Sequence, residues 1–287
     1  MPVKRLIVTA DDFGASSFVN EAVIRAFKEG ILRFASLLVD GPAASEAAKL
    51  ARENPGLGVG LHLELGTVPH SPVVSGLGYF FLKKWRASLD FEIKRQIEKL
   101  KNFGILPTHA DGHTNIHIHP VIFPALLRAC QKHEISRLRV PAGEYHLGRL
   151  YLKKIPFLNK MEYAAFGILG PYLKKQAKKI APEIEILPRC FGLLRSGRMT
   201  EDYVLRLLEN LPEGDSEIYF HPSLDPKSRA TGDFPTKTHQ TITEFETLTS
   251  PRILESLKRL DISLSQRGGS DKEKIQTKTT ESRGYGG

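Results

Sequence analysis

The sequence predicts an α/β protein whose parallel strands close into a (β/α) barrel of the TIM type rather than an open sheet. Apolar strand segments and helical segments alternate about eight times along the chain, which is typical of a parallel α/β fold. The segment 5–10, for example, is apolar and β-branched, as expected for a strand that is buried on both faces. The 287 residues, 41% of them hydrophobic, suffice for one large core.

Each expected element follows from its residues and its boundaries. The helix over 17–28 ends at Glu29-Gly30, and an alanine-rich helix over 42–54 is stopped by Pro55-Gly56. A loop rich in Gly, Pro and Ser then follows the third strand. The expected strands are 5–10, 35–39, 57–63, 107–111, 138–140, 190–194, 217–220 and 262–264. The expected helices are 17–28, 42–54, 89–102, 120–134, 200–211 and 250–260.

One barrel domain is expected over residues 1–264, with an insert at about 145–189 that is rich in basic and aromatic residues. The insert holds nine Lys and Arg residues against three acids, within a formal net charge of +9 for the chain. Such a stretch fits an anionic membrane surface or nucleic acid, and it fits a solvated pair of helices equally well. Residues 265–287 carry too little apolar surface to order, which predicts a disordered polar tail.

Composition and short motifs exclude several classes of protein. Two cysteines, Cys130 and Cys190, cannot hold a disulfide scaffold of this size, and they fit a reducing cytoplasm. The chain shows no secretory leader and no run of ~20 apolar residues, so we expect a cytoplasmic protein, soluble or peripheral at the inner membrane face. A P-loop sequence and the Gly-x-Ser-x-Gly elbow of serine hydrolases are both absent from the sequence.

Several polar residues of types that are unusual in a protein core are located where the expected strands end. In a parallel barrel, the carboxyl ends of all strands meet on one rim, and active sites assemble on that rim. Isolated core histidines would have no reason to select this edge, so the convergence of five separate elements predicts a functional site there. The residues concerned are Asp11, Asp12, His62, Asp111, His113, Arg139 and His221.

Asp11 and Asp12 are adjacent carboxylates directly after the first expected strand. Because successive strand residues point to opposite faces, both can reach one site only where the strand ends, and Gly14 gives the chain freedom to turn there. Adjacent carboxylates repel each other unless a cation neutralises one of them. The pair therefore predicts a metal ligand beside a general base. The alternative is that one Asp caps the next helix, although Ser16 and Ser17 are better placed for that cap.

The segment 109–120 contains His109, His113, His117 and His119, four of the ten histidines in the chain. Imidazole with carboxylate suits Zn²⁺ and carboxylate with water suits Mg²⁺, so the sequence predicts one divalent cation without deciding between them. His113 directly follows the expected strand and is the predicted ligand. His117 and His119 lie further out, as supports of the ligands, as substrate contacts or as ordinary loop residues.

The other polar residues on the rim have alternative explanations. A lone histidine in an alternating strand, such as His62, is more often a hydrogen-bonded core residue, but its position at the rim favours a functional role. His221 would stand across from the metal group, a position suited to protonating a leaving group. Arg139 would orient a carboxylate or stabilise an oxyanion, with a structural salt bridge as an equal alternative. Asp111, His117 and Arg139 are thus expected to contact the substrate or support the ligands.

Taken together, these segments resemble the YdjC-like carbohydrate deacetylases. The resemblance extends over about residues 4–264 and rests on Thr9-Ala10-Asp11-Asp12-Phe13-Gly14, Gly60-Leu61-His62-Leu63, the histidine-rich segment 109–120 and His221-Pro222. Segments 191–200 and 216–222 are most similar to the hopanoid-biosynthesis-associated branch of the family, HpnK. One departure is Asn115, which stands in the middle of a segment where family members often carry His-x-His-x-x-x-His.

The resemblance implies a distorted barrel, similar to that of polysaccharide deacetylases, that uses a divalent metal to remove acetyl groups from N-acetylated amino sugars. Position by position, Asp12, His62 and His113 match the metal ligands, Asp11 the base and His221 the acid. For the hopanoid branch, the implied substrate is a glycolipid, a hopanoid that bears N-acetylglucosamine. A protein that docks on a membrane through its basic insert could reach such a substrate.

Two other functions fit the same residues. The substrate could instead be a soluble chitooligosaccharide, or the protein could be a non-catalytic, membrane-associated scaffold with a relict metal site. A nucleic-acid partner is not expected, because the basic stretch lacks a recognised binding module. The sequence leaves open whether the chain is a monomer or a homodimer.

Overall fold

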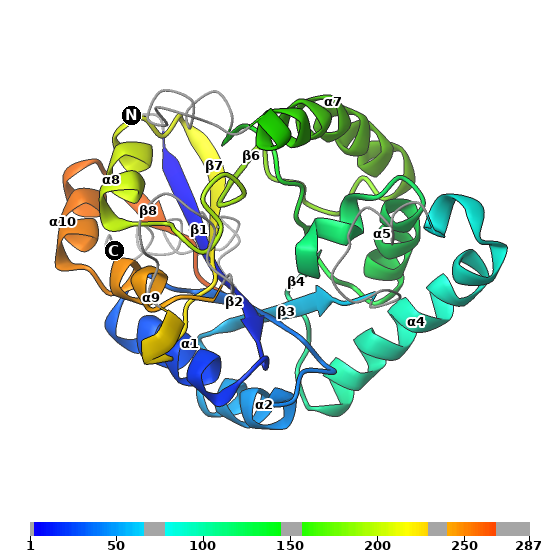
Figure 1. The fold of residues 1–287 in the computed structure, drawn as a ribbon, viewed down its shortest axis with the longest axis horizontal. Helices are drawn as coiled ribbons and strands as arrows, with labels where there is room; N and C mark the ends of the chain where they lie inside the picture. Colours follow the sequence, from blue (N-terminus) through cyan, green and yellow to red (C-terminus); the bar gives the residue numbers. More distant parts are fainter. Residues whose placement is uncertain (1–2, 66–77, 145–156, 229–239, 268–287) are drawn as a thin grey trace, which may run out of the picture.

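The computed structural model describes residues 3–65, 78–144, 157–228 and 240–267, and it has the predicted fold class. Within these ranges, eight parallel strands form one curled sheet with helices around its outside (Figure 1). The strands are β1 (Lys4–Phe13), β2 (Phe34–Leu37), β3 (Gly58–Leu63), β4 (His109–Gly112), β5 (Arg137–Leu138), β6 (Arg189–Phe191), β7 (Gly214–Phe220) and β8 (Ile262–Leu264).

The strands follow the order β5-β4-β3-β2-β1-β7-β6, and β8 also pairs with β1, so β1 has three strand partners. One edge of β1 pairs with β7 over residues 4–10, while the other edge pairs with β8 over residues 4–6 and with β2 between Thr9 and Phe13. Isolated bridges from Arg137 to Glu185 and from Gly143 to Cys190 connect the two outer strands. The sheet therefore curls almost into a cylinder, which confirms the distorted (β/α) barrel.

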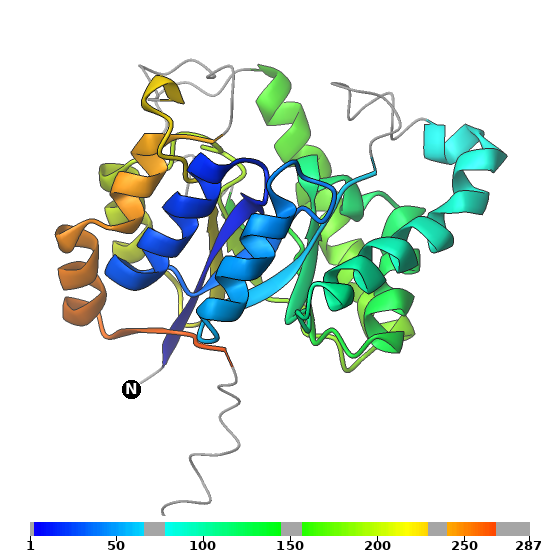
Figure 2. The ribbon, with the colours of Figure 1, turned by 90° about the horizontal axis from the view of Figure 1, so that it is seen from below.

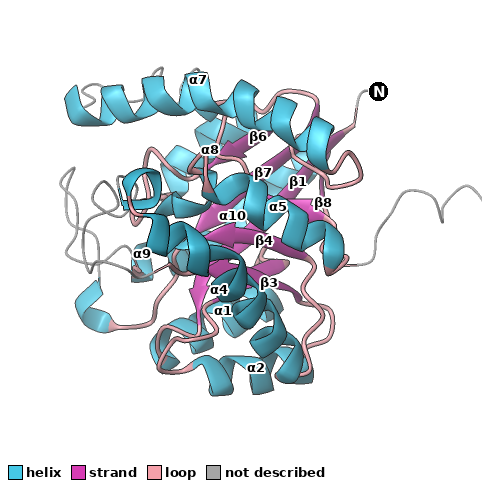
Figure 3. Cartoon of the chain, turned by 90° about the vertical axis from the view of Figure 1, so that its right-hand side faces the viewer, coloured by secondary structure: helices cyan, strands magenta, loops and turns pink. Residues whose placement is uncertain are grey.

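Most helices cover the outer face of the sheet, as Figure 3 shows with the strands in magenta inside the ring of helices. Apolar residues of β1 such as Leu6, Val8 and Ala10 belong to the core between sheet and helices. The helices are α1 (Ser17–Glu29), α2 (Ala44–Glu53), α4 (Lys83–Asn102), α5 (Ile122–Lys132), α7 (Phe157–Ile180), α8 (Glu201–Glu209), α9 (Ile242–Leu248) and α10 (Pro251–Arg259), with 3-10 helices η1 (His113–Ile118) and η2 (Pro226–Ser228).

The structure corrects several predicted boundaries. Strand β1 runs on to Phe13, so Asp11 and Asp12 lie inside the strand and not after it. Asp111 likewise lies within β4, whereas Arg139 follows β5, which ends at Leu138. Helix α4 begins at Lys83, well before residue 89, and α9 has no counterpart among the expected helices.

The insert contains one long helix where a pair was considered. Helix α7 spans 24 residues with Pro171 inside it. The rest of the basic insert, residues 145–156, lies outside the described residues, as does most of the expected tail, residues 268–287. Among the described helices, none combines the length and the apolar character needed to cross a bilayer.

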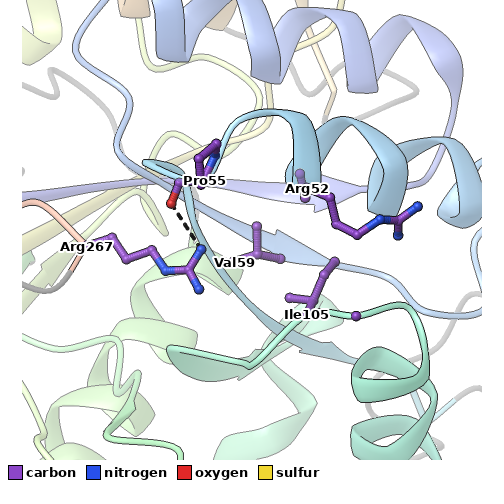
Figure 4. A pocket seen from close by; sticks show the side chains of 7 residues that line it. Arg52, Pro55, Val59, Ile105 and Arg267 are labelled. Carbon is purple, nitrogen blue, oxygen red and sulfur yellow. Dashed lines mark hydrogen bonds between the residues drawn. The ribbon is translucent and has the colours of Figure 1, made fainter.

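A small pocket lies near the amino-terminal end of β3, away from the rim. Arg267, the last described residue, donates hydrogen bonds to the carbonyl groups of Pro55 at 3.1 Å and Leu57 at 3.4 Å beside this pocket (Figure 4). The lining contains none of the residues predicted to form the site. Its members are Ala51, Arg52, Pro55, Val59, Gly104, Ile105 and Arg267.

Candidate active site and metal centre

Polar side chains line the inside of the barrel because every second residue of a strand points inward. The inward polar residues include Glu217 and Tyr219 of β7, Thr9 and Asp11 of β1, and His221, which directly follows β7. Thr9 Oγ1 donates a hydrogen bond to Glu217 Oε1 at 2.9 Å, which connects the two strands across the interior. All of these side chains except His221 are fully buried, so they form a polar core separate from the apolar one.

A backbone irregularity near the end of β1 brings Asp11 and Asp12 into one site. The pairing of β1 with β2 shifts register between Ala10 and Phe13, and Asp12 has a φ of 63°. Positive φ is uncommon outside glycine, but Asp adopts it more readily than most residues. Both neighbouring carboxylates are therefore buried at the rim, and Ser16, not an aspartate, provides the side-chain cap of α1.

Asp12, His62 and His113 bring three potential metal ligands together from β1, β3 and η1. His113 Nδ1 lies 3.0 Å from Asp12 Oδ1, and His62 Nε2 lies 3.3 Å from the same oxygen. The three ligand atoms all lie within 4.8 Å of one another. Asp12 and His62 are buried, whereas the His113 side chain is 39% exposed and forms the open side of the group.

The Asp111 carboxylate contacts Nδ1 of His62, the ring nitrogen that faces away from Asp12. His62 Nδ1 lies 2.6 Å from Asp111 Oδ1, and Ser36 Oγ donates to Asp111 Oδ2 at 2.7 Å. Burial would lower the pKa of His62, but the charge of Asp111 and hydrogen bonds to Asp111 and Asp12 raise it to about 10. Proteins commonly orient a metal-binding histidine through a carboxylate on its far nitrogen.

The pKa of Asp12 is lowered, as expected for a carboxylate that binds a metal ion. Burial would raise this pKa, but hydrogen bonds with His113 and His62 outweigh burial and hold it well below its usual range. Gln240 Nε2 also donates a hydrogen bond to Asp12 Oδ2 at 2.9 Å. Asp12 is therefore an anion with one oxygen turned toward two imidazoles.

Arg139 lies at the centre of a second buried cluster, among three carboxylates. Its guanidinium contacts the two oxygens of Asp11 at 2.6 and 2.9 Å, Asp111 at 2.8 Å and Glu217 at 3.0 Å. It also lies over the ring of Tyr219, with the carbon of the guanidinium 4.5 Å from the ring centroid. Arg139 thus both orients the Asp11 carboxylate and takes part in a structural ion-pair cluster.

Asp11 has a raised pKa in spite of its ion pair with Arg139. Burial and the nearby charge of Asp111 outweigh the attraction of Arg139 and His62, so the pKa of Asp11 rises to about 6. Burial acts on Asp111 in the same direction, but Arg139 and His62 lower the pKa of Asp111 well below its usual range. A carboxyl group with a pKa near neutrality is suited to act as a general base.

His221 lies across from Asp11 and is held by a loop and by α9. His221 Nε2 is 3.9 Å from Asp11 Oδ2, and its Nδ1 is 3.4 Å from Ser196 Oγ. Glu244 Oε2 is 3.9 Å from His221 Nδ1 and accepts a hydrogen bond from the His221 backbone N–H. Glu244 also accepts from the Met199 N–H at 3.0 Å, so it joins the loop to the strand end that carries His221.

Two other histidines of the segment 109–120 lie outside the ligand group. His117 is fully buried, and its Nε2 donates to the carbonyl of Arg139 at 3.0 Å. Burial lowers the pKa of His117 to about 4, so this ring is neutral and supports the backbone beside the cluster. His119 packs against Phe80, with ring centroids 4.3 Å apart, on the side of α4.

Asn115 has a backbone role in the turn that follows His113. Asn115 and the preceding Thr114 have φ values of 56° and 53° inside η1. Asn is one of the few residues other than glycine that adopt this conformation readily. Asn115 therefore suits the turn that the backbone makes here.

The sequence provided no prediction for four residues of the site: Ser36, Glu217, Gln240 and Glu244. Glu217 had a local signal, because it lies on the same face of its strand as His221 and is an acid among apolar residues. Gln240 and Glu244 had none, since they come from a region more than a hundred residues beyond the histidine-rich segment. Only folding brings them to the rim.

The comparisons with known proteins agree on one family. Residues 5–259 match the sequence profile of a family described as YdjC-like protein. A carbohydrate deacetylase of Geobacillus stearothermophilus is 34% identical over 150 residues, which cover 49% of this chain and 61% of that protein. A chitooligosaccharide deacetylase of Enterobacter sp. (strain 638) is 40% identical over 136 residues, 42% of this chain and 53% of that protein. The match therefore spans less than two thirds of the length of either relative.

A solved structure supports the fold. A protein of Enterococcus faecalis V583, with a suggested role in cellobiose-phosphate cleavage, superimposes with a TM-score of 0.65 at 22% identity. The superposition covers 92% of this chain and 97% of that one, and at this identity it concerns the fold alone. The family profile covers the whole set of rim residues from Asp11 to His221. The chain belongs to the YdjC-like protein family.

Proposed function

We propose that this protein is a hydrolase that removes the acetyl group from an N-acetylated amino sugar with a divalent metal as cofactor. The observation that carries the proposal is the juxtaposition of the three potential ligands with Asp11 and His221, which lie 3.9 Å apart. Membership of the YdjC-like family and the deacetylase descriptions of two relatives support the type of reaction.

Asp12, His62 and His113 would hold the metal. One carboxylate and two imidazoles suit Zn²⁺, and Mg²⁺ is the alternative if water completes the shell. The buried carboxylates Asp11, Asp12, Asp111 and Glu217 outnumber the cationic groups Arg139 and His62, so a divalent cation would improve the local charge balance. Binding would also release the proton that the raised pKa of His62 retains.

A second group, Asp11, His62 and Asp111, also has its ligand atoms within 4.8 Å of one another. Arg139 already contacts both carboxylates of this group, so a metal ion there would lie against a guanidinium of like charge. Among the described residues Asp12 contacts no Arg or Lys side chain; its charged neighbours are imidazoles, which can release a proton and bind a metal ion. This difference favours the group that contains Asp12.

In the proposed reaction, Asp11 serves as the base and His221 as the acid. A divalent ion would supply a Lewis acid for the acetamide carbonyl and lower the pKa of the attacking water. Asp11, oriented by Arg139, takes the proton of the water as oxygen bonds to the carbonyl carbon. His221 donates a proton to the amine nitrogen as the C–N bond breaks, which releases acetate and the free amino sugar. Each proton transfer contributes ~10²–10⁴ in rate.

We propose a glycolipid, a hopanoid that bears N-acetylglucosamine, as the preferred substrate. The support is the similarity of segments 191–200 and 216–222 to the hopanoid-associated branch, and Ser196 of the first segment lies beside His221. A soluble chitooligosaccharide is the second candidate, favoured by the description of the Enterobacter relative. A relict site on a scaffold would bind metal without releasing acetate.

The experiment combines metal analysis of the purified protein with acetate release from a panel of N-acetylated sugars and glycolipids. We expect about one divalent ion per chain, as in other sites with three protein ligands, and release of acetate that stops on chelation and returns with metal. Faster release from the glycolipid than from diacetylchitobiose would support the hopanoid substrate, and the reverse would favour the soluble one. Metal-loaded protein that releases no acetate from any member of the panel would refute the hydrolase.

A further inference from the structure

The start of α4, together with the residues directly before it, carries an exposed surface that the proposed reaction does not use. Phe80, Phe81 and Leu82 are 45%, 76% and 47% exposed, and the basic residues that follow them are exposed as well. We propose that this surface docks the protein on a lipid bilayer that contains anionic headgroups. It is called the α4 patch below and consists of Phe80, Phe81, Leu82, Lys83, Lys84 and Arg86.

The positive charge of the α4 patch indicates that its partner is an anionic lipid surface. No Asp or Glu occurs between Leu65 and Leu89, whereas Lys83, Lys84 and Arg86 are cationic. The helix itself does not explain the two lysines, since cations in the first turn oppose the helix dipole and this turn contains no acid. Lipid headgroups attract such residues, by about fivefold in affinity for each one.

The aromatic residues around the α4 patch fix its apolar side chains in an outward position. Tyr79 is buried and packs edge-on against Trp85, with ring centroids 5.5 Å apart. Phe80 lies against His119, and Arg86 Nη1 donates to the carbonyl of Phe80 at 3.0 Å. Because these neighbours hold the inward positions, Phe81 and Leu82 stay in contact with solvent. A run of exposed apolar residues of this kind marks an interaction site.

The location of the α4 patch suits a membrane. In Figure 2 the first turn of α4, in cyan, lies at the upper right, on the side of the molecule toward which β1 points. In Figure 1 the same turn lies at the outer edge of the molecule. A protruding aromatic turn flanked by lysines fits insertion into a soft interface, where apolar side chains enter the acyl boundary and bases contact headgroups.

This inference does not depend on the proposed deacetylation. If that proposal holds, a membrane on this side favours a glycolipid over a soluble substrate. The two proposals fail separately, because vesicle binding is measured without substrate and acetate release from diacetylchitobiose is measured without vesicles.

The chain offers a native probe of docking, since its one tryptophan, Trp85, adjoins the α4 patch. The experiment measures Trp85 fluorescence and co-sedimentation with vesicles of phosphatidylcholine alone or mixed with phosphatidylglycerol, at low and high salt. We expect binding to the mixed vesicles that weakens with salt and quenching of Trp85 by brominated acyl chains.

Two pairs of variants locate the contact. Phe81→Ser should lower vesicle affinity at least about tenfold, because a buried phenylalanine side chain is worth that much or more on transfer from water. The matched control is Phe91→Ser, since Phe91 is 70% exposed and lies within α4, outside the patch. Lys84→Gln should lower affinity about fivefold, whereas Lys94→Gln, also exposed on α4, should leave it unchanged.

The outcomes decide the proposal. Circular dichroism and retained acetate release from diacetylchitobiose would show that Phe81→Ser is folded. Wild-type protein that ignores anionic vesicles at low salt would overturn the proposal, and so would equal binding by Phe81→Ser and wild type, which would place the contact on another surface such as α7. A dimer that dissociates in Phe81→Ser would also overturn it, because a second copy of the chain would then cover the patch.

Discussion

The site has two halves, one around Asp12 and one around Asp11, and the electrostatics of these two halves differ. Asp12 faces the imidazoles of His62 and His113, and hydrogen bonds to them hold its pKa well below the usual range in spite of burial. Asp11 faces Arg139, yet burial and the charge of Asp111 raise its pKa to about 6. One residue with positive φ at the strand end therefore separates two neighbouring carboxylates, one on the proposed ligand side of the site and one on the proposed base side.

The two sides also differ in access to solvent. On the ligand side, His113 has a side chain that is 39% exposed, whereas on the base side His221 is 12% and Arg139 is 2% exposed. The proposed ligand side is thus open to solvent at His113, while a buried network of ion pairs fixes the proposed base side. The contrast predicts that substitutions on the first side act on metal binding and those on the second act on turnover or stability.

The largest effect is expected on the ligand side. Asp12→Ala and His113→Ala should each lose bound metal and lower kcat/KM at least about a thousandfold, because a catalytic metal contributes several kcal/mol to transition-state stabilisation. Metal content by plasma mass spectrometry, together with acetate release, provides the measurement. Normal metal content in Asp12→Ala would show that the ligand side is assigned wrongly.

On the base side, Asp11→Asn should keep the metal and lose turnover. The amide cannot accept the proton of water, so kcat should fall ~10²–10⁴-fold. Metal content and acetate release are measured again. Retained metal with lost turnover would distinguish Asp11→Asn from Asp12→Ala. If Asp11→Asn lost its metal while Asp12→Ala retained it, the two roles would have to be exchanged.

A third effect concerns stability. Arg139→Met leaves Asp11, Asp111 and Glu217 without their shared cation, so the free energy of unfolding in urea should fall by about 3–5 kcal/mol. The matched control is Arg95→Met. Arg95 also contacts two carboxylates, Asp40 and Glu92, but it is partly exposed.

Because exposed ion pairs contribute only about 0–1 kcal/mol, the control should remain close to wild type. Equal losses in the two variants would contradict the picture of a buried cluster that depends on Arg139.

The smallest effect is expected for Glu244→Gln, which alters the support of His221. A misplaced imidazole should lower kcat about ten- to a hundredfold, with metal content and KM unchanged. Glu144→Gln is the control, since Glu144 is also buried and accepts hydrogen bonds from the Leu194 N–H of the same loop and from Tyr203 Oη of α8, each at 3.0 Å. A general effect on the loop would slow both variants alike, and that result would remove Glu244 as a positioning residue for His221.

Much of the site could be predicted because its residues have local signals. Strand periodicity located the rim, and a carboxylate or imidazole at the end of an apolar segment is conspicuous in the sequence, as at His62 and His221. The positive φ of Asp12 had no such signal, since strand β1 continues through Asp11 and Asp12 by means of a register shift that depends on its partner β2.

The remaining parts depend on contacts between distant segments. Glu244 reaches His221 through α9, a helix of only seven residues whose boundaries carry little periodicity. Arg139 could be predicted as an ion-pair partner but not as the centre of three carboxylates, because they come from β1, β4 and β7. Such convergence is set by strand order, which local sequence patterns do not determine.

The central claim is that Asp12, His62 and His113 share one divalent cation. Anomalous diffraction from crystals grown with Zn²⁺ or Mn²⁺ tests this claim most directly. The account predicts one strong anomalous peak bonded to Asp12 Oδ1, His62 Nε2 and His113 Nδ1. A peak between Asp11, His62 and Asp111, or a metal-loaded crystal without a peak at Asp12, would contradict it.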